Sequence, residues 1–148
     1  MSAYRKILVP VDGSKASQRG LREAVRLARE QHARIVLLHV VDEFYVVASP
    51  EMGAYAADMV EVLRKSGKRL LEKARAFAAK QRVKVDTLMR EIVGGPAAGE
   101  IVRQARKMRA DLIVIGTHGR RGIRRLALGS DAEQVVRTSP VPVLLVRL

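Results

Sequence analysis

Residues 111–134 read DLIVIGTHGRRGIRRLALGSDAEQ. The continuous apolar run from Leu112 to Ile115 is bounded by an aspartate and a glycine, which predicts a fully buried strand ending at Gly116. A segment rich in glycine and arginine follows, and a helical pattern then runs from about Ser130 to Arg137. This succession of strand, loop and helix is the repeating unit of α/β proteins.

The remainder of the chain repeats this alternation of short apolar runs and helical patterns. We expect further strands over residues 7–11, 35–41, 83–89 and 141–146. Apolar side chains at helical spacing predict three more helices, which cover about residues 21–28, 63–78 and 101–108. Strands that alternate with helices of this size predict a parallel sheet with helices on both faces. The runs at residues 7–11 and 112–116 are the most continuously apolar, as expected at the centre of such a sheet.

Three further segments complete the pattern. Residues 42–57 contain Ser49-Pro50 and Gly53 and show little periodicity, so we expect a loop or lid there. The alternation of apolar and mostly polar side chains over residues 83–89 favours a half-exposed edge strand. Gly94-Gly95-Pro96 predicts a turn, with Pro96 in the first turn of the next helix.

The composition predicts one cytoplasmic α/β domain over residues 1–148. An apolar content of 48% suits a globular protein, aromatic residues make up only 3%, and the absence of cysteine excludes disulfides. Residues 1–10 lack the apolar core of a signal peptide, and no apolar run reaches the ~18 residues of a membrane span. The net charge of +13 favours polyanionic partners, but charge alone does not distinguish nucleotides, nucleic acid and anionic lipid. The histidines His32, His39 and His118 show no metal-ligand spacing.

The glycine-rich segment after Gly116 has the chemistry of a phosphate-binding loop. Glycines let the backbone turn tightly and approach a ligand closely, so that backbone N–H groups can point at phosphate oxygens. The N-terminus of the following helix adds unpaired donors and partial positive charge. Four arginines lie in the loop, namely Arg120, Arg121, Arg124 and Arg125. The spacing is neither that of a P-loop nor that of the dinucleotide fingerprint, so the glycines alone leave a simple turn as an alternative.

The spacing Gly116-x2-Gly119-x9-Gly129-Ser130 resembles the ATP-binding signature of the universal stress protein family. The start of the chain, from Ile7 to Ser14, resembles the first strand and turn of that family. The other matching landmarks are Leu37-Leu38-His39-Val40, Gly94-x-Pro96, the strand at residues 111–116 and the closing Ser139-Pro140-Val141-Pro142-Val143-Leu144. The resemblance therefore covers nearly the whole chain.

The resemblance implies a doubly wound open sheet of five parallel strands in the order 3-2-1-4-5, of the adenine nucleotide alpha-hydrolase-like type. Helices would cover both faces, and members of the family are usually dimers. In that order the direction in which successive strands are added reverses between strands one and four, and ligands of open α/β sheets bind at such a switch point. The end of strand one, from Pro10 to Asp12, is therefore expected beside the end of strand four at Gly116.

The resemblance also implies a set of nucleotide-binding residues. Asp12 and the backbone of Pro10 and Val11 are expected near the base and ribose, and the backbone of Val40 at the adenine edge. The phosphate side is expected to comprise Gly116, Thr117, His118, Gly119, Arg120, Gly129, Ser130 and Asp131. The implied ligand is ATP, with AMP and ADP as alternatives and Mg²⁺ as an optional companion. No catalytic residue and no metal-binding residue is assigned.

Several of these residues also have a structural interpretation. Asp12 or Ser14 would cap the helix that follows them. Ser130-x-x-Glu133 would form a capping box, which is compatible with phosphate binding. Asp131 departs from the neutral residue common in the family, and it would either oppose an incoming anion or help to hold Mg²⁺. His39 is expected to lie in or near the sheet.

The function inferred is that of an ATP-binding stress-response protein acting as a switch or chaperone-like factor. No positioned nucleophile, carboxylate pair or metal cluster stands out, so no efficient enzyme is predicted, and the family leaves slow ATP hydrolysis or autophosphorylation open. The alternatives are a nucleic-acid-binding protein, against which the scarcity of aromatic residues counts, a true ATPase or kinase-like enzyme, and a nucleotide-free dimeric scaffold. The apolar strand from Val141 to Val146 is expected at a sheet edge, where pairing with a second copy would form a homodimer.

Overall fold

A computed structural model describes residues 2–118 and 128–148, and it contains one sheet of five strands. The strands are β1 (Lys6–Pro10), β2 (Arg34–Asp42), β3 (Lys84–Ile92), β4 (Leu112–Gly116) and β5 (Val143–Val146). All neighbouring pairs are parallel, and the spatial order is β3-β2-β1-β4-β5. The order predicted from the sequence is confirmed.

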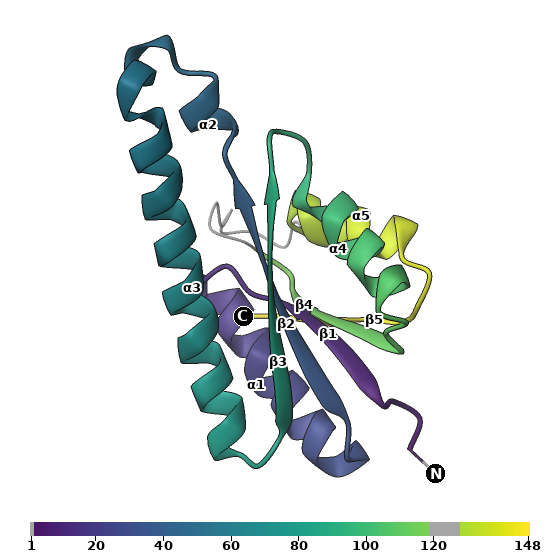
Figure 1. Cartoon of the computed structure of the whole chain (residues 1–148). Helices are drawn as coiled ribbons and strands as arrows, with labels where there is room; N and C mark the ends of the chain where they lie inside the picture. Colours follow the sequence, from purple (N-terminus) through teal and green to yellow (C-terminus); the bar gives the residue numbers. More distant parts are fainter. Residues whose placement is uncertain (1, 119–127) are drawn as a thin grey trace.

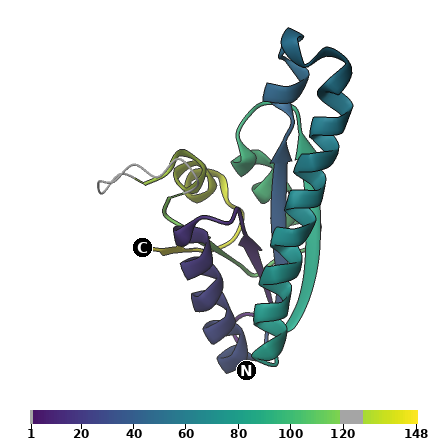
Figure 2. The ribbon, with the colours of Figure 1, turned by 90° about the vertical axis from the view of Figure 1, so that its left-hand side faces the viewer.

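Helices cover both faces of the sheet. They are α1 (Lys15–Gln31), the one-turn α2 (Phe44–Val47), the 3₁₀ segment η1 (Pro50–Tyr55), α3 (Ala56–Lys80), α4 (Ala97–Lys107) and α5 (Ser130–Thr138). Figures 1 and 2 show α1 and α3 on one side of the strands and α4 and α5 on the other. Among the described helices, none combines the length and the apolar character needed to cross a membrane.

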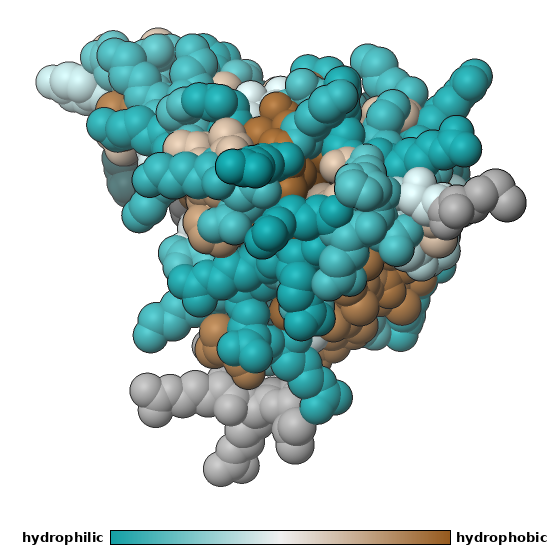
Figure 3. All heavy atoms as spheres, turned by 90° about the horizontal axis from the view of Figure 1, so that it is seen from below, coloured by the Kyte–Doolittle hydropathy of each residue, from teal (hydrophilic) through white to brown (hydrophobic). Residues whose placement is uncertain are grey.

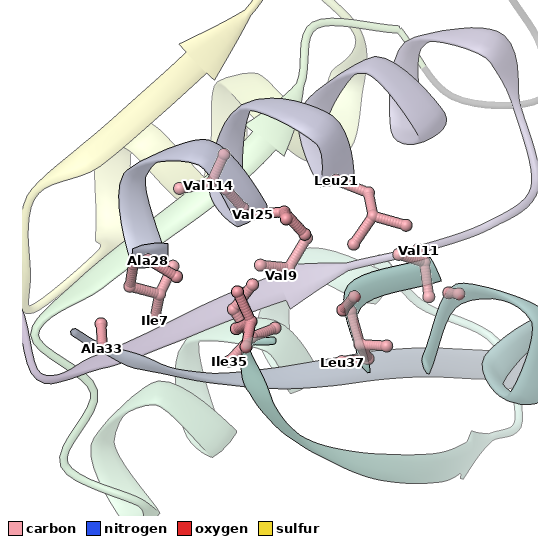
Figure 4. Close-up of a cluster of buried hydrophobic side chains, with 14 of the residues drawn as sticks. Ile7, Val9, Val11, Leu21, Val25, Ala28, Ala33, Ile35, Leu37 and Val114 are labelled. Atoms are coloured by element: carbon pink, nitrogen blue, oxygen red, sulfur yellow. The ribbon is translucent and has the colours of Figure 1, made fainter. Parts of the chain in front are cut away.

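The alternation of side chains along the strands creates a core on each face of the sheet. Ile7 and Val9 point toward α1 and α3, whereas Leu8 between them points toward α4 and α5. All three side chains are fully buried, because β1 is the central strand and both of its faces are covered. Figure 4 shows the first core, in which Leu21 and Val25 of α1 lie over the side chains of β1 and β2.

Residues 42–57 are not the loop or lid that the sequence predicted. They contain α2, η1 and the first residues of α3, which begins at Ala56 rather than near Leu63. The periodicity was missed because this part of the chain extends past the end of the sheet, where few side chains become buried (Figure 1). Val46 is the one buried residue of α2, and η1 has none.

The other differences lie at the ends of elements. The strand expected at residues 83–89 is indeed at the sheet edge but continues to Ile92. The strand expected from Val141 begins at Val143, although the carbonyl of Pro142 already accepts a hydrogen bond from the Ile113 N–H at 3.0 Å. Pro96 is the N-cap of α4 instead of a member of its first turn, which still spares the helix an unpaired N–H.

Candidate functional site

The carboxyl ends of β1 and β4 lie side by side at the point where the strand order reverses. Ile7 pairs with Leu112 and Leu8 with Ile113, whereas β2 lies on the other side of β1 and β5 on the other side of β4. The connections from β1 and β4 therefore leave in opposite directions, and we refer to the place between the two strand ends as the crevice. Open α/β sheets bind their ligands at this position.

The chain after β1 is held by a compact network of hydrogen bonds. The Val11 N–H donates to the carbonyl of Leu38 at 2.8 Å and continues the pairing with β2. The carboxylate of Asp12 accepts from the Ser14 N–H at 2.8 Å, and the Asp12 N–H donates to the hydroxyl of Ser17 at 3.1 Å. Ser14 is the N-cap of α1, since its hydroxyl accepts from the Ser17 N–H at 3.1 Å. Of the two capping candidates, Ser14 is thus the cap and Asp12 fixes the turn that presents it.

His39 supports the same turn from the side of α3. Its side chain is buried, as expected, and Nδ1 lies 2.8 Å from the carbonyl oxygen of Val11. Because a carbonyl only accepts, Nδ1 carries the proton in this contact. Gly67 of α3 makes room for the ring, since a Cβ there would lie 2.7 Å from the imidazole Cδ2.

The chain after β4 is anchored at both ends of the glycine-rich segment. Thr117 is buried, and its N–H donates to the carbonyl of Val146 at 3.0 Å. The carbonyl of Thr117 accepts a 2.6 Å hydrogen bond from the Gly129 N–H. Residues 117 and 129 therefore lie side by side.

A contact across the crevice joins the two strand ends. The Ser14 hydroxyl lies 3.5 Å from the carbonyl oxygen of His118, a residue that is partly buried. The predicted residues Pro10, Val11 and Asp12 are thus brought together with Gly116, Thr117, His118 and Gly129. Val40 lies two residues beyond Leu38 on β2, on the same edge. The predicted residues Gly119 and Arg120, together with Arg121, Arg124 and Arg125, lie outside the described residues.

The start of α5 differs from the predicted capping box. Gly129 is the N-cap, and Ser130 is the first helical residue, with an exposed side chain. Within the described residues, no side chain caps this helix, and the carboxylate of Glu133 pairs with Arg137 at 2.8 Å instead of turning back. Glycine has no side chain to offer, so no described side chain occupies the first N–H groups of α5, which are the groups that bind anions at helix N-termini.

Asp131 caps a different helix from the one that contains it. Its carboxylate accepts a 3.2 Å hydrogen bond from the Ala98 N–H in the first turn of α4. The N-cap of α4 is Pro96, which has no side-chain acceptor. Asp131 therefore links α5 to α4, and this accounts for an acidic residue where a neutral one was expected.

Replacement of Asp131 by alanine should lower the free energy of unfolding by about 1 kcal/mol, the usual loss when a helix cap is removed. Chemical denaturation with urea would measure the loss. Asp131→Asn keeps an oxygen acceptor for the Ala98 N–H and is expected to lose less than half as much. Equal stability of the wild type and Asp131→Ala would contradict the assigned capping role.

An ion-pair cluster holds the carboxyl ends of β2 and β3 against α3. Arg64 donates to both carboxylate oxygens of Glu91, at 2.6 and 2.8 Å, and lies 3.6 Å from Glu43 Oε1. This oxygen of Glu43 is buried without a hydrogen-bond partner in the described part of the chain. Burial and a hydrogen bond with Glu91 raise the pKa of Glu43 above its ordinary 4.5, whereas the hydrogen bond from Arg64 lowers the pKa of Glu91.

The raised pKa of Glu43 predicts a stabilising substitution. The folded protein binds this proton more tightly than the unfolded chain does, so ionisation costs stability as the pH rises above 4.5. Glu43→Gln removes the cost, and its Tm should exceed that of the wild type at pH 7. The difference should shrink as the pH is lowered and vanish once wild-type Glu43 is protonated. Glu61→Gln, on the exposed side of Arg64, is the control and should bring no gain.

The described residues contain no group of three or more His, Cys, Asp or Glu side chains that could hold a metal ion.

The sequence predicted both strand ends but not the contact of His39 with Val11 or the capping role of Asp131. Each of these is a contact between residues far apart in the chain, 28 and 33 positions respectively. No local pattern could have indicated them.

The order of the five parallel strands, with helices on both faces, defines an α/β protein of the doubly wound class. The family model described as the universal stress protein family matches residues 3–147, and the chain belongs to this family. Universal stress protein MJ0531 of Methanocaldococcus jannaschii is 39% identical over 144 residues, which cover 97% of this chain and 82% of the relative.

Two solved structures show the same fold. The hypothetical protein MJ0577 superposes with a TM-score of 0.85 at 26% identity, over 99% of this chain and 97% of that one. A universal stress protein in complex with cAMP superposes with a TM-score of 0.65 at 27% identity, over 99% of this chain and 98% of that one.

Proposed function

We propose that this chain binds an adenine nucleotide in the crevice between β1 and β4, with the phosphates at the N-terminus of α5. The observation that carries the proposal is the meeting of the two strand ends beside a helix N-terminus that no described side chain caps. The related universal stress protein solved with cAMP supports the adenine assignment. We take ATP as the ligand, with AMP and ADP as the alternatives.

The roles proposed for individual residues are those that the family resemblance implies, and the positions of the described residues support them. Asp12, with the backbone of Pro10, Val11 and Val40, would face the base and ribose. The Ser130 N–H at the start of α5 would face the phosphates, together with the loop residues Gly119 and Arg120. Gly129 would serve as the N-cap without a side chain, because its own N–H is bonded to Thr117. Asp131 is engaged with α4, so it opposes the phosphates less than its place in the sequence predicted. A Mg²⁺ ion bound with the nucleotide would be coordinated mainly by phosphate oxygens and water.

The biological role that we propose is a nucleotide-dependent switch or chaperone-like factor in the stress response, in the cytoplasm, with slow ATP hydrolysis at most. The whole chain, residues 1–148, would act as one nucleotide-binding domain. A homodimer would form through β5, because this strand lies at the sheet edge and leaves Leu144 37% exposed. Pairing with a second copy would cover the unpaired backbone groups of that edge.

Calorimetric titration with ATP, ADP, AMP and cAMP, with GTP as the control, tests the proposed ligand. In a separate sample, the purified protein is denatured and any nucleotide that it releases is identified by its mass. We expect binding of at least one adenine nucleotide and weaker binding of GTP. A failure of every adenine nucleotide to bind at millimolar concentration would overturn the proposal.

A further inference from the structure

A segment between β2 and the middle of α3 projects beyond the sheet. We call residues 42–62 the tip segment; it comprises the last residue of β2, α2, η1 and the first turns of α3. Figures 1 and 2 show it at the top of the molecule, past the ends of the strands. The proposed nucleotide site does not use it.

The tip segment exposes an unusual amount of apolar surface. Three of the five aromatic residues of the chain lie in it. Its exposed apolar side chains, with the exposed fractions, are Phe44 (46%), Tyr45 (63%), Val47 (57%), Tyr55 (70%), Met59 (38%) and Val62 (52%). In a chain so poor in aromatic residues, this concentration on one projection indicates a contact surface.

The tip segment is held in place rather than loosely attached. The carboxylate of Asp42 accepts hydrogen bonds from the Phe44 N–H at 2.9 Å and the Gly94 N–H at 3.1 Å. The Glu43 N–H donates to the carbonyl of Ile92 at 2.9 Å, and Phe44 packs edge-on against Tyr45. Apolar groups on a preorganised support lose little entropy when they bind a partner.

The charge of the tip segment is opposite to that of the rest of the molecule. Residues 35–63 contain five acidic residues and no lysine or arginine, namely Asp42, Glu43, Glu51, Asp58 and Glu61. All 28 lysines and arginines of the chain therefore lie elsewhere, with ten of its 15 acidic residues. Glu51 and Asp58 are exposed and form no ion pair within the described residues. The partner of this surface is accordingly cationic.

A cationic surface of suitable shape lies on α1. Five exposed basic residues follow one another at alternating intervals of four and three positions, which places them on one face of the helix. They are Lys15, Arg19, Arg22, Arg26 and Arg29, which we call the basic stripe. At 1.5 Å per residue the stripe is about 21 Å long. Only Arg26 forms an ion pair within the described residues, with Glu23 at 2.6 Å.

We propose that the tip segment docks on the basic stripe of a second copy of this chain. The helices α1 and α3 cover the same face of the sheet, and the tip segment extends from one end of that layer (Figure 2). Most of the molecular surface at the opposite end is hydrophilic (Figure 3). In the proposed dimer a two-fold rotation would place each tip segment on the other copy's α1, so that the contact is made twice and closes on itself.

The chemistry of the two surfaces is complementary. Glu51 and Asp58 would face the arginines of the stripe, and the rings of Tyr45 and Tyr55 would stack on guanidinium groups. The aliphatic stems of the arginines would cover the apolar side chains of the tip segment. A nucleic acid would meet the stripe but be repelled by the acidic tip segment, so it does not explain both surfaces.

Sedimentation velocity of two charge-reversed variants tests this contact. One variant carries Glu51→Lys and Asp58→Lys in the tip segment, and the other carries Arg19→Glu and Arg22→Glu in the stripe. At low salt the wild type should have at least twice the mass of either variant. Mixing the two variants should restore the larger species, because each reversed surface then meets a complementary one. The double variant Arg106→Glu, Lys107→Glu on α4 makes the same charge change elsewhere and should keep the wild-type mass.

The mixing experiment also guards against misfolding, because restoration requires both variants to be folded. Leu144→Glu at the β5 edge, which addresses the homodimer proposed above, should leave the response to the charge reversals unchanged. An unchanged mass in either reversed variant, or a mixture without the larger species, would overturn the proposal. Reduced RNA or DNA binding by the stripe variant alone, without a change of mass, would assign the stripe to nucleic acid and overturn it too.

Discussion

Gly116→Ala is expected to lower the free energy of unfolding by about 3 kcal/mol, at the upper end of the usual cost of overpacking. A Cβ at this position would lie 2.6 Å from both the carbonyl carbon and the oxygen of Ala16, and 3.0 Å from the Ser17 N. These are backbone atoms of the first turn of α1, which cannot rotate away as a side chain could. The helix or the end of β4 would have to move.

Thermal unfolding of Gly116→Ala should show a Tm roughly 6–12 °C below that of the wild type, given the size of the domain. Gly99→Ala is the matched control, because nothing lies within 4 Å of a Cβ there and the residue is inside α4. Alanine is the better helix former, so the control should be as stable as the wild type or more stable by up to ~1 kcal/mol. If Gly116→Ala had the Tm of the wild type, α1 would be able to shift at little cost. The close contact with the α1 backbone would then not explain the glycine at position 116.

The close contact between β4 and α1 also gives Gly116, the first glycine of the Gly116-x2-Gly119-x9-Gly129-Ser130 motif, a structural role. From the sequence, Gly116 is a residue that lets the loop turn and approach a ligand. In the structure it lets a helix approach a strand, since a Cβ at Gly20 of α1 would in turn lie 3.2 Å from the Gly116 N. The two glycines face each other, so the spacing of α1 and β4 beside the crevice depends on both.

The sequence predicted most of the fold because its strongest signals are local. Continuous apolar runs identified β1 and β4, whose faces are both covered by helices. The strand order followed from the family resemblance and placed the two strand ends together. Residues 42–57 were predicted as a loop or lid because the helical residues there are mostly exposed, and an exposed helix leaves no apolar stripe to recognise.

The details of the site could not be predicted because they depend on contacts between distant residues. The pattern Ser130-x-x-Glu133 matches a capping box, yet the chain enters α5 one residue earlier, at Gly129. Its hydrogen bond to Thr117 draws Gly129 against the end of β4, which fixes where the helix begins. Asp131 then turns to α4, whose own N-cap is a proline. A sequence motif records neither of these tertiary constraints.

Ser130→Glu is expected to weaken nucleotide binding at least tenfold while leaving the fold intact. Ser130 is exposed at the first position of α5, where an acidic side chain suits the helix dipole. The same charge would stand beside the proposed phosphate position. Two unit charges ~6 Å apart repel by about 3 kcal/mol at an effective dielectric constant near 20, and salt screens part of this. A residual 1.4 kcal/mol corresponds to a tenfold change in Kd.

Stability and affinity should therefore change independently in this variant. Thermal unfolding should give a Tm close to that of the wild type, while titration with ATP gives the weaker Kd. Gln134→Glu places the same charge four residues further along α5, about 6 Å from the first turn, and should reduce affinity much less. Ser130→Ala separates the loss of the hydroxyl from the added charge and should bind nearly as well as the wild type. If Ser130→Glu binds ATP as tightly as Ser130→Ala does, the phosphates do not lie at the N-terminus of α5.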